Sequence, residues 1–179
     1  MTQRPQSAEL LRVRDLRTHL FLKRGVLKAV DGVTFDLGAG QTLGLIGESG
    51  SGKTMTGLSL LGLLPRPAGR IVAGSIQLNG RELVGLSDEV MAREIRGQEI
   101  AMISQDPMTS LNPVFSVGAQ VAAPLKQHGI ARGREAATAA VAELARVRVP
   151  APEDRAREFP HQFSGGMRQR VVAAMAISC

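Results

Sequence analysis

With 179 residues and 44% hydrophobic side chains, the chain is long enough for one domain with an apolar core. The net charge of +6 is spread along the chain rather than gathered in a tract, and only 3% of residues are aromatic, so no nucleic-acid partner is expected. One cysteine, Cys179, excludes an internal disulfide and fits a reducing cytosol. We find no signal-peptide pattern, and the longest apolar runs are too short to cross a bilayer.

The first third of the chain has the alternating pattern of β-strands. Its apolar positions, at every second or third residue, are Leu11, Val13, Leu16, Val33, Phe35 and Leu37. Residues 42–46 predict a short buried strand, and residues 53–64 predict a helix stopped by Pro65. Residues 74–79 predict a further strand, closed by the turn pair Asn79-Gly80.

The pattern then becomes mainly helical. Residues 87–95 predict a helix with Ser87 at its N-cap, and residues 100–104 predict another buried strand. Three more helices are predicted, over residues 117–127 (with an interruption or kink at Pro124), 134–147 and 165–177. We therefore expect an α/β fold with a β-rich front and a helical second part.

A glycine-rich loop carries the clearest chemistry. The segment Gly47-Glu48-Ser49-Gly50-Ser51-Gly52-Lys53-Thr54 fits the pattern G-x-x-x-x-G-K-[ST] between a predicted strand and a predicted helix. Glycines let the backbone wrap around phosphates with its N–H groups pointing inward, and the start of the following helix adds a positive end. Lys53 is expected on the β- and γ-phosphate oxygens, and the Thr54 hydroxyl on Mg²⁺. The alternative is a chance match in a glycine turn, which the flanking strand and helix disfavour.

Two further segments narrow the choice among nucleotide-binding proteins. Gln105 follows the predicted strand at 100–104 and precedes the chain-breaking pair Asp106-Pro107. The other segment, Phe163-Ser164-Gly165-Gly166-Met167-Arg168-Gln169-Arg170, places Ser-Gly-Gly at the start of an apolar helix. Ser164 can cap that helix, and the two glycines leave N–H groups accessible to an anion. Taken alone, this second segment favours an ordinary capped helix start.

Together the three segments resemble the Walker A loop, Q-loop and signature motif of the ABC ATPase family. The resemblance implies a P-loop NTPase core with an antiparallel β subdomain and a helical signature subdomain. It also implies that two ATPase subunits face each other, with ATP and Mg²⁺ between them. Ser164, Gly165 and Gly166 would contact the γ-phosphate bound across that interface. Lys53 and Gln105 would act in catalysis, with Gln105 at the Mg²⁺ and the attacking water.

Longer stretches resemble the oligopeptide, dipeptide and nickel importer branch of the family. They are Gly47–Lys53, Lys28-Ala29-Val30-Asp31-Gly32-Val33, Gln105-Asp106-Pro107-Met108-Thr109-Ser110-Leu111-Asn112-Pro113 and Phe163–Met167. The resemblance implies an ATP-binding subunit that couples ATP hydrolysis to peptide uptake, peripheral at the cytoplasmic face of the cell membrane. Implied partners are a second ABC ATPase subunit, two transmembrane permease subunits and an extracytoplasmic solute-binding protein. Permease contact is implied from Met108 into the helical part.

Part of the family pattern has no match. Hydrolysis in this family uses an apolar strand ending in Asp-Glu, whereas Asp88-Glu89 precedes the Q-loop and is interpreted as the first turn of a helix. None of His19, His128 and His161 lies where the family has its switch histidine. The nearest candidate for an adenine-stacking aromatic is Phe21, which could equally be a core residue of the first hairpin.

We therefore expect a partial ABC ATPase domain that ends before Walker B. Its expected parts are a β subdomain and P-loop core over about 10–106, a helical subdomain over about 107–165, and the signature helix over 165–179. Without the Asp-Glu strand, this polypeptide is expected to be inactive in hydrolysis and aggregation-prone or only partly folded. Two alternatives remain open: a nucleotide-binding fragment without hydrolytic activity, and a non-transport ABC ATPase of DNA repair or translation.

Overall fold

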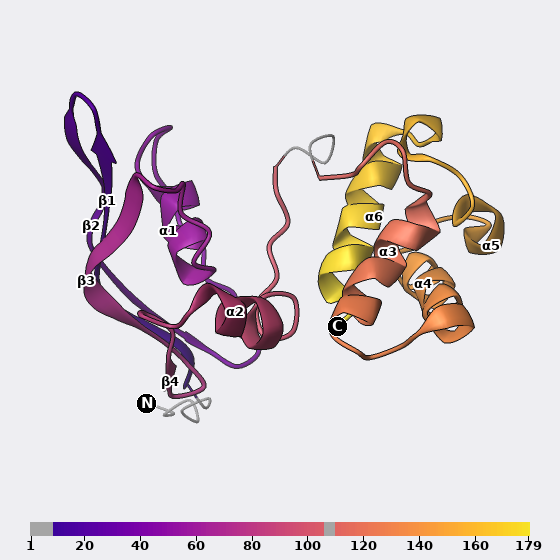
Figure 1. The fold of residues 1–179 in the computed structure, drawn as a ribbon, viewed down its shortest axis with the longest axis horizontal. Helices are drawn as coiled ribbons and strands as arrows, with labels where there is room; N and C mark the ends of the chain where they lie inside the picture. Colours follow the sequence, from indigo (N-terminus) through magenta and orange to yellow (C-terminus); the bar gives the residue numbers. More distant parts are fainter. Residues whose placement is uncertain (1–8, 106–109) are drawn as a thin grey trace, which may run out of the picture. The chain divides into compact units, whose positions relative to one another are not determined.

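The computed structural model describes residues 9–105 and 110–179 (Figure 1). The chain divides into two compact units, the first reaching to Met91 and the second beginning at Ala92, and each is described by itself. The domain boundaries expected from the sequence, near residues 106 and 165, stay a prediction. No helix in the described parts of the chain is both long enough and apolar enough to cross a membrane.

The first unit is built on an antiparallel sheet with the strand order β2-β1-β3-β4. Its strands are β1 (Glu9–Leu22), β2 (Gly25–Gly38), β3 (Gly69–Leu78) and β4 (Arg81–Glu82). The alternating pattern of the sequence therefore predicted the main strands correctly, although β1 and β2 are longer than expected. Val13, Leu16 and Ile76 are almost fully buried on the inner face of this sheet. Burial of these side chains stabilises the unit through the hydrophobic effect.

The turn between β3 and β4 confirms the prediction made from Asn79-Gly80. Both residues have positive φ, 49° and 78°, which is the conformation that this pair favours in a two-residue hairpin turn. Glu82 closes the turn by accepting hydrogen bonds from the N–H groups of Ile76 (2.9 Å) and Val84 (3.0 Å) and from the hydroxyl of Ser75. Desolvation raises the pKa of Glu82, but the hydrogen bonds to its carboxylate outweigh that effect and the pKa is lowered.

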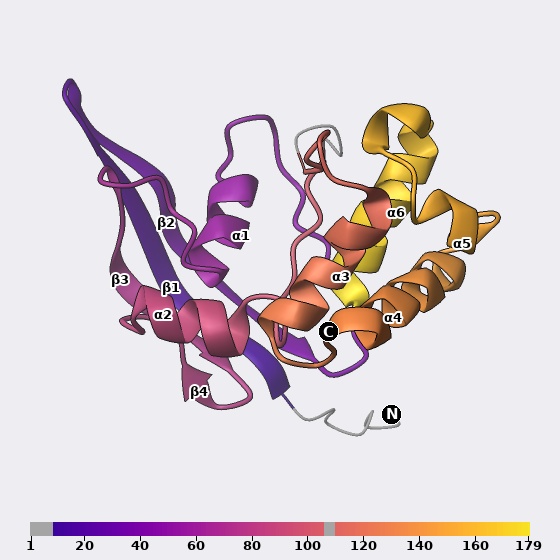
Figure 2. The same cartoon turned by 45° about the vertical axis from the view of Figure 1, so that its right-hand side comes forward.

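Helix α1 (Lys53–Leu60) follows the glycine-rich loop and lies beside the sheet (Figures 1 and 2). The buried hydroxyls of Thr18 on β1 and Ser59 on α1 form a hydrogen bond of 2.8 Å. The helix is four residues shorter than predicted because Gly62 adopts a left-handed conformation (φ 61°) and the Leu63 N–H bonds back to the Leu58 carbonyl. Glycine, rather than Pro65, therefore ends the helix.

The two short buried strands predicted at residues 42–46 and 100–104 are not formed, so this part of the prediction is wrong. Both segments are irregular and exposed, and the Ile46 side chain is 98% exposed. Neither lies in a ladder with a described strand, and the one parallel pairing among described residues is a single bridge between Arg96 and Ile100. An extended segment without a neighbour leaves its backbone groups unpaired, so apolar composition alone does not make it a strand.

Helix α2 (Asp88–Val90) continues into a π-helical turn, η1 (Met91–Ile95), which together match the helix predicted over residues 87–95. The Ser87 hydroxyl accepts a hydrogen bond from the Val90 N–H at 3.3 Å. The N-cap prediction is thus confirmed, and Asp88 and Glu89 occupy the first turn of the helix as expected.

The second unit is helical and has its own core. Its helices are α3 (Val117–Gln127), α4 (Gly133–Arg146), α5 (Pro152–Arg155), the 3₁₀ turn η2 (Pro160–Gln162) and α6 (Gly165–Ile177). Helices α3, α4 and α6 pack against one another (Figure 2) around fully buried side chains such as Val121, Leu144 and Val171. The three helices predicted here are confirmed to within one residue at each end.

Candidate functional site

The glycine-rich loop connects β2 to α1, and the Lys53 ammonium group lies in its mouth. Lys53 Nζ donates to the carbonyl oxygens of Gly47 and Glu48, at 2.7 Å each, and to Ser51 Oγ at 3.2 Å. The lysine therefore holds the loop in a closed curve and places a positive charge at its centre. Glu48, Ser49 and Thr54 of the predicted phosphate loop are exposed.

The loop can take this path because of where its glycines fall. Gly50 and Gly52 have φ angles of 83° and 90°, in the region that favours glycine. A β-carbon at residue 52 would also lie 2.3 Å from the Ala29 carbonyl oxygen, and one at residue 47 would lie 2.5 Å from Ser51 Oγ. This backbone thus requires glycine at residues 50 and 52, whereas a side chain at residue 47 would need the Ser51 hydroxyl to move.

The start of α1 is open to an anion. Gly52 stands at the N-cap and makes no side-chain hydrogen bond, so the first N–H groups of the helix have no cap. By contrast, α3 and α6 are capped by the hydroxyls of Ser116 and Ser164. An uncapped helix start beside a lysine fits a phosphate group. The exposed Thr54 hydroxyl makes no hydrogen bond among the described residues and offers an oxygen to a cation such as Mg²⁺.

Gln105 lies in the second unit and is exposed to solvent. The hydroxyls of Ser104, the residue before Gln105, and Ser110 form a hydrogen bond of 2.6 Å. The remainder of the Q-loop motif, Asp106 to Thr109, lies outside the described residues. The role expected of Gln105 therefore stays a prediction.

The Ser-Gly-Gly segment begins α6 as expected. Ser164 Oγ accepts a hydrogen bond from the Met167 N–H at 3.4 Å, while its own O–H remains able to donate. A β-carbon at Gly165 or Gly166 would meet no atom within 4 Å, so packing within the chain does not require glycine there. Glycine costs a helix up to about 1 kcal/mol relative to alanine. Two glycines in open space therefore leave room for the close approach of another molecule.

The structure thus assembles two separate groups of the residues singled out in the sequence. Residues 47–54 come together in the first unit, and residues 163–167 at the start of α6 in the second. Phe21 is 46% exposed, with the Arg70 guanidinium 5.6 Å from its ring centre, so the interpretation of Phe21 as a core residue is wrong. Its expected contact with adenine stays a prediction.

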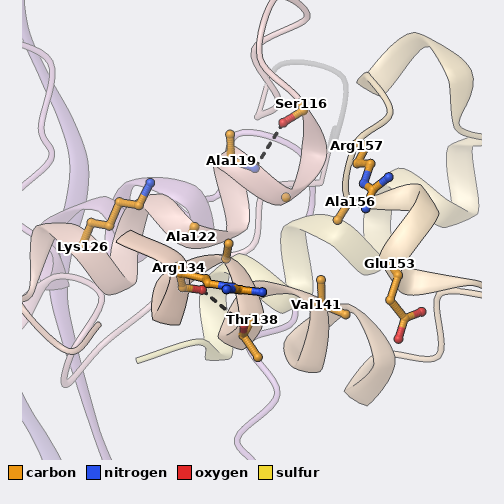
Figure 3. A pocket seen from close by; sticks show the side chains of 12 residues that line it. Ser116, Ala119, Ala122, Lys126, Arg134, Thr138, Val141, Glu153, Ala156 and Arg157 are labelled. Carbon is orange, nitrogen blue, oxygen red and sulfur yellow. Dashed lines mark hydrogen bonds between the residues drawn. The ribbon is translucent and has the colours of Figure 1, made fainter. Parts of the chain in front are cut away.

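The second unit also holds features that the sequence did not reveal. A cavity of about 490 Å³ lies along α3, α4 and the segment around α5, and basic side chains come to it from three places (Figure 3). Gln120, on α3, is only 8% exposed and bonds to the preceding turn. The sequence offered one signal for Gln120, an amide within the apolar stripe of a helix. It offered none for the basic residues that line the cavity, because they are far apart along the chain.

A family model described as "ABC transporter" matches residues 30–179. The chain therefore belongs to the ABC transporter family. The fold agrees with this assignment: a dimeric structure of the ATP-binding cassette MJ0796 bound to ADP and Pi superposes with a TM-score of 0.78, covering 94% of this chain and 69% of that one at 22% identity.

Several curated relatives of this chain are named as peptide transport proteins. The chain is 47% identical over its full length to a probable peptide ABC transporter ATP-binding protein, y4tR, of Sinorhizobium fredii, of which it covers 53%. It is also 47% identical to the oligopeptide transport ATP-binding protein OppD of Bacillus subtilis, over 94% of this chain and 47% of the relative. The dipeptide transport protein DppD of the same organism is 43% identical over 96% and 51%. The chain thus spans about half the length of the curated relatives it matches.

Proposed function

We propose that this chain is the nucleotide-binding part of an ABC importer ATPase that couples ATP binding and hydrolysis to the uptake of peptides. The observation that carries the proposal is the closed loop around Lys53, followed by the uncapped start of α1. Family membership and the relatives support the cargo class, because the relatives described above are named for peptide, oligopeptide or dipeptide transport.

Each candidate residue then has a defined task. The loop N–H groups and the Lys53 ammonium bind the phosphates of ATP, and the Thr54 hydroxyl and the Gln105 amide oxygen hold Mg²⁺. The bound Mg-ATP supplies the phosphoanhydride whose hydrolysis drives import. Gln105 also orients the attacking water.

The signature segment acts on a second subunit. Ser164 caps α6 by accepting a hydrogen bond, and its free O–H donates to a phosphate held by that subunit. Gly165 and Gly166 let the phosphate approach the helix backbone, since nothing in the chain fills the space beside them. In this arrangement neither subunit has a complete site alone.

The assembly follows from the same proposal. A second ABC ATPase subunit completes each nucleotide site, two permease subunits span the membrane, and a solute-binding protein delivers the peptide from outside. The ATPase is peripheral and lies at the cytoplasmic face of the membrane. The sequence of 179 residues contains no apolar strand ending in Asp-Glu, so we expect this polypeptide by itself to bind nucleotide without hydrolysing it.

Nucleotide binding is tested with a fluorescent ATP analogue and its adenosine counterpart. Lys53→Ala should weaken binding of the triphosphate about tenfold or more, which corresponds to roughly 1.4 kcal/mol, and leave the weak binding of adenosine unchanged. Lys23→Ala, which removes an exposed lysine at the tip of the β1–β2 hairpin, is the matched control. Equal triphosphate affinity in the Lys53 variant and the control would overturn the proposal.

Transport is tested in the complete assembly, reconstituted in vesicles with permease subunits and binding protein. Uptake of a labelled dipeptide should require ATP and should cease with Lys53→Ala. Uptake of nickel ions without peptide uptake would reject the peptide cargo while leaving the ATPase assignment in place.

A further inference from the structure

The cavity of the second unit is bounded by positive side chains that have no partner within the chain. Lys126 comes to it from α3, Arg134 from α4 and Arg157 from the residues after α5 (Figure 3). In the described parts of the chain, these three side chains form no hydrogen bond and no ion pair, whereas the nearby Arg155 pairs with Glu158 at 2.6 Å. The volume of about 490 Å³ is typical of a site for a small ligand. Three unpaired cations around such a cavity favour an anionic ligand.

Glu153 gives the two ends of the cavity different charges. It is the one acidic residue among the described residues that line the cavity, and its carboxylate also has no partner in the described parts of the chain. Figure 3 shows Glu153 toward one end of the cavity, Lys126 toward the other, and Arg134 between them. The matching ligand carries a positive group at one end, and negative groups along its length and at its other end.

Helix α3 gives the cavity the length of a short peptide. Gly118 and Lys126 both line the cavity, and the eight residues of helix that separate them rise about 12 Å. The Gly118 N–H donates to the Ala156 carbonyl oxygen at 2.8 Å, so the residues around α5 lie at the start of α3. Three extended peptide residues span about 10 Å. A tripeptide therefore reaches from the end of the cavity at Glu153 to the end at Lys126.

Two hydroxyl groups in the lining can bind peptide groups. Ser116 Oγ accepts from the Ala119 N–H at 3.4 Å, so its own O–H is able to donate to a carbonyl oxygen. The Thr138 hydroxyl donates to the Arg134 carbonyl at 3.2 Å, so its oxygen is able to accept from an N–H. The rest of the lining is mainly small side chains, such as Ala122, over which a peptide backbone can lie closely.

We propose that this cavity binds a short acidic peptide of about three residues with free termini. The terminal ammonium group pairs with Glu153, and the terminal carboxylate pairs with Lys126. Acidic side chains of the peptide pair with Arg134 and Arg157. The site lies in the second unit, whereas the phosphate loop lies in the first, so the inference goes beyond the proposed function and does not depend on it.

The test is calorimetric titration of the whole ATPase with the tripeptide alanyl-glutamyl-glutamate, which carries one ammonium group and three carboxylates. Alanyl-glutaminyl-glutamine has the same length and termini but lacks the two acidic side chains. It should bind about tenfold more weakly, because two ion pairs are lost and an exposed pair contributes up to about fivefold.

Matched pairs of peptide and variant assign the two ends. Acetylation of the peptide's amino terminus should weaken binding to the wild type about fivefold, and in Glu153→Gln the acetylated and free peptides should bind equally. Amidation of the carboxyl terminus should act in the same way, with its effect lost in Lys126→Met. Arg146→Ala removes a charge of α4 that does not line the cavity and should keep both preferences.

Several results would overturn the inference: no measurable binding of alanyl-glutamyl-glutamate, equal binding of the glutaminyl peptide, or terminal preferences that persist in Glu153→Gln and Lys126→Met. ATP binding, measured in parallel, should be unchanged in these variants and shows that they are folded. Lys53→Ala separates the two proposals, since it should weaken ATP binding and leave peptide binding intact. Peptide binding without any ATP binding by the wild type would reject the proposed function and keep the peptide site.

Discussion

The Gly118 N–H donates to the Ala156 carbonyl oxygen at 2.8 Å, and a β-carbon at residue 118 would lie 2.7 Å from that same oxygen. The adjacent Val117 N–H donates to the Glu158 carbonyl, also at 2.8 Å. The start of α3 is therefore bound by the backbone that follows α5, and this contact leaves no room for a side chain.

Gly118→Ala should destabilise the protein by about 1–3 kcal/mol, because either α3 or the segment after α5 must move. The measurement is the midpoint of urea unfolding followed by circular dichroism. Gly57→Ala is the control, since a β-carbon at residue 57 of α1 meets nothing within 4 Å. That control should be neutral or up to about 1 kcal/mol stabilising. Equal midpoints for the two variants would contradict the argument.

Gly52→Ala should damage the phosphate loop and leave most of the fold intact. The added β-carbon would lie 2.3 Å from the Ala29 carbonyl, and the φ of 90° is strained for any side chain. We expect triphosphate affinity to fall about tenfold or more, with the circular dichroism spectrum of the wild type retained. Triphosphate binding at wild-type strength would show that the loop tolerates a different path.

Ser164 can be changed so that capping and phosphate contact are separated. Ser164→Ala removes the cap of α6 and should cost about 1 kcal/mol of stability. Ser164→Asp restores a good cap but repels phosphate, so stability should be kept while ATP-dependent pairing of two subunits is lost. Pairing is measured by analytical ultracentrifugation of the whole ATPase with and without ATP. Normal pairing in the aspartate variant would assign Ser164 to capping alone.

The lowered pKa of Glu82 predicts that the stability of the protein depends on pH. Its pKa is lowered from the ordinary 4.5 in the folded protein, so the ionised carboxylate favours folding at pH values above 4.5. This contribution is lost as the pH falls through the lowered folded-state pKa. Glu82→Gln should therefore be less stable than the wild type at neutral pH, and the difference in unfolding free energy should shrink in acid. If the difference in unfolding free energy between the two proteins did not change with pH, the Glu82 carboxylate would not be its cause.

The sequence predicted those elements whose stability is local. The alternation of Val33, Phe35 and Leu37, the turn at Asn79-Gly80 and the caps at Ser87 and Ser164 act over a few residues, and all appear in the structure. The prediction of strands at residues 42–46 and 100–104 was wrong for the opposite reason. A strand needs a neighbour in space, and the composition of five residues does not tell whether one is present.

The features of the candidate site also separate into those that a local sequence pattern predicts and those that depend on packing. The closed loop over residues 47–54 follows from glycine and lysine at fixed spacing, which impose a local shape, and its binding of phosphate stays a prediction. The cavity of the second unit was not predicted, since Lys126, Arg134 and Arg157 come to line it only after three helical segments have packed. Gln120 was also missed, because an amide in an apolar stripe indicates a buried polar contact without naming the turn that it binds.

The bonds of Lys53 to the Gly47 and Glu48 carbonyls have a consequence for binding. The loop is already curved before any phosphate arrives, so little ordering entropy is left to lose on binding. In the proposed function, phosphate oxygens would replace the Gly47 and Glu48 carbonyls as partners of the Lys53 ammonium group. Removal of Lys53 should therefore act twice, by deleting a charge and by loosening the loop. Proteolysis between Gly47 and Gly52 should be faster in Lys53→Ala than in the wild type, even without nucleotide.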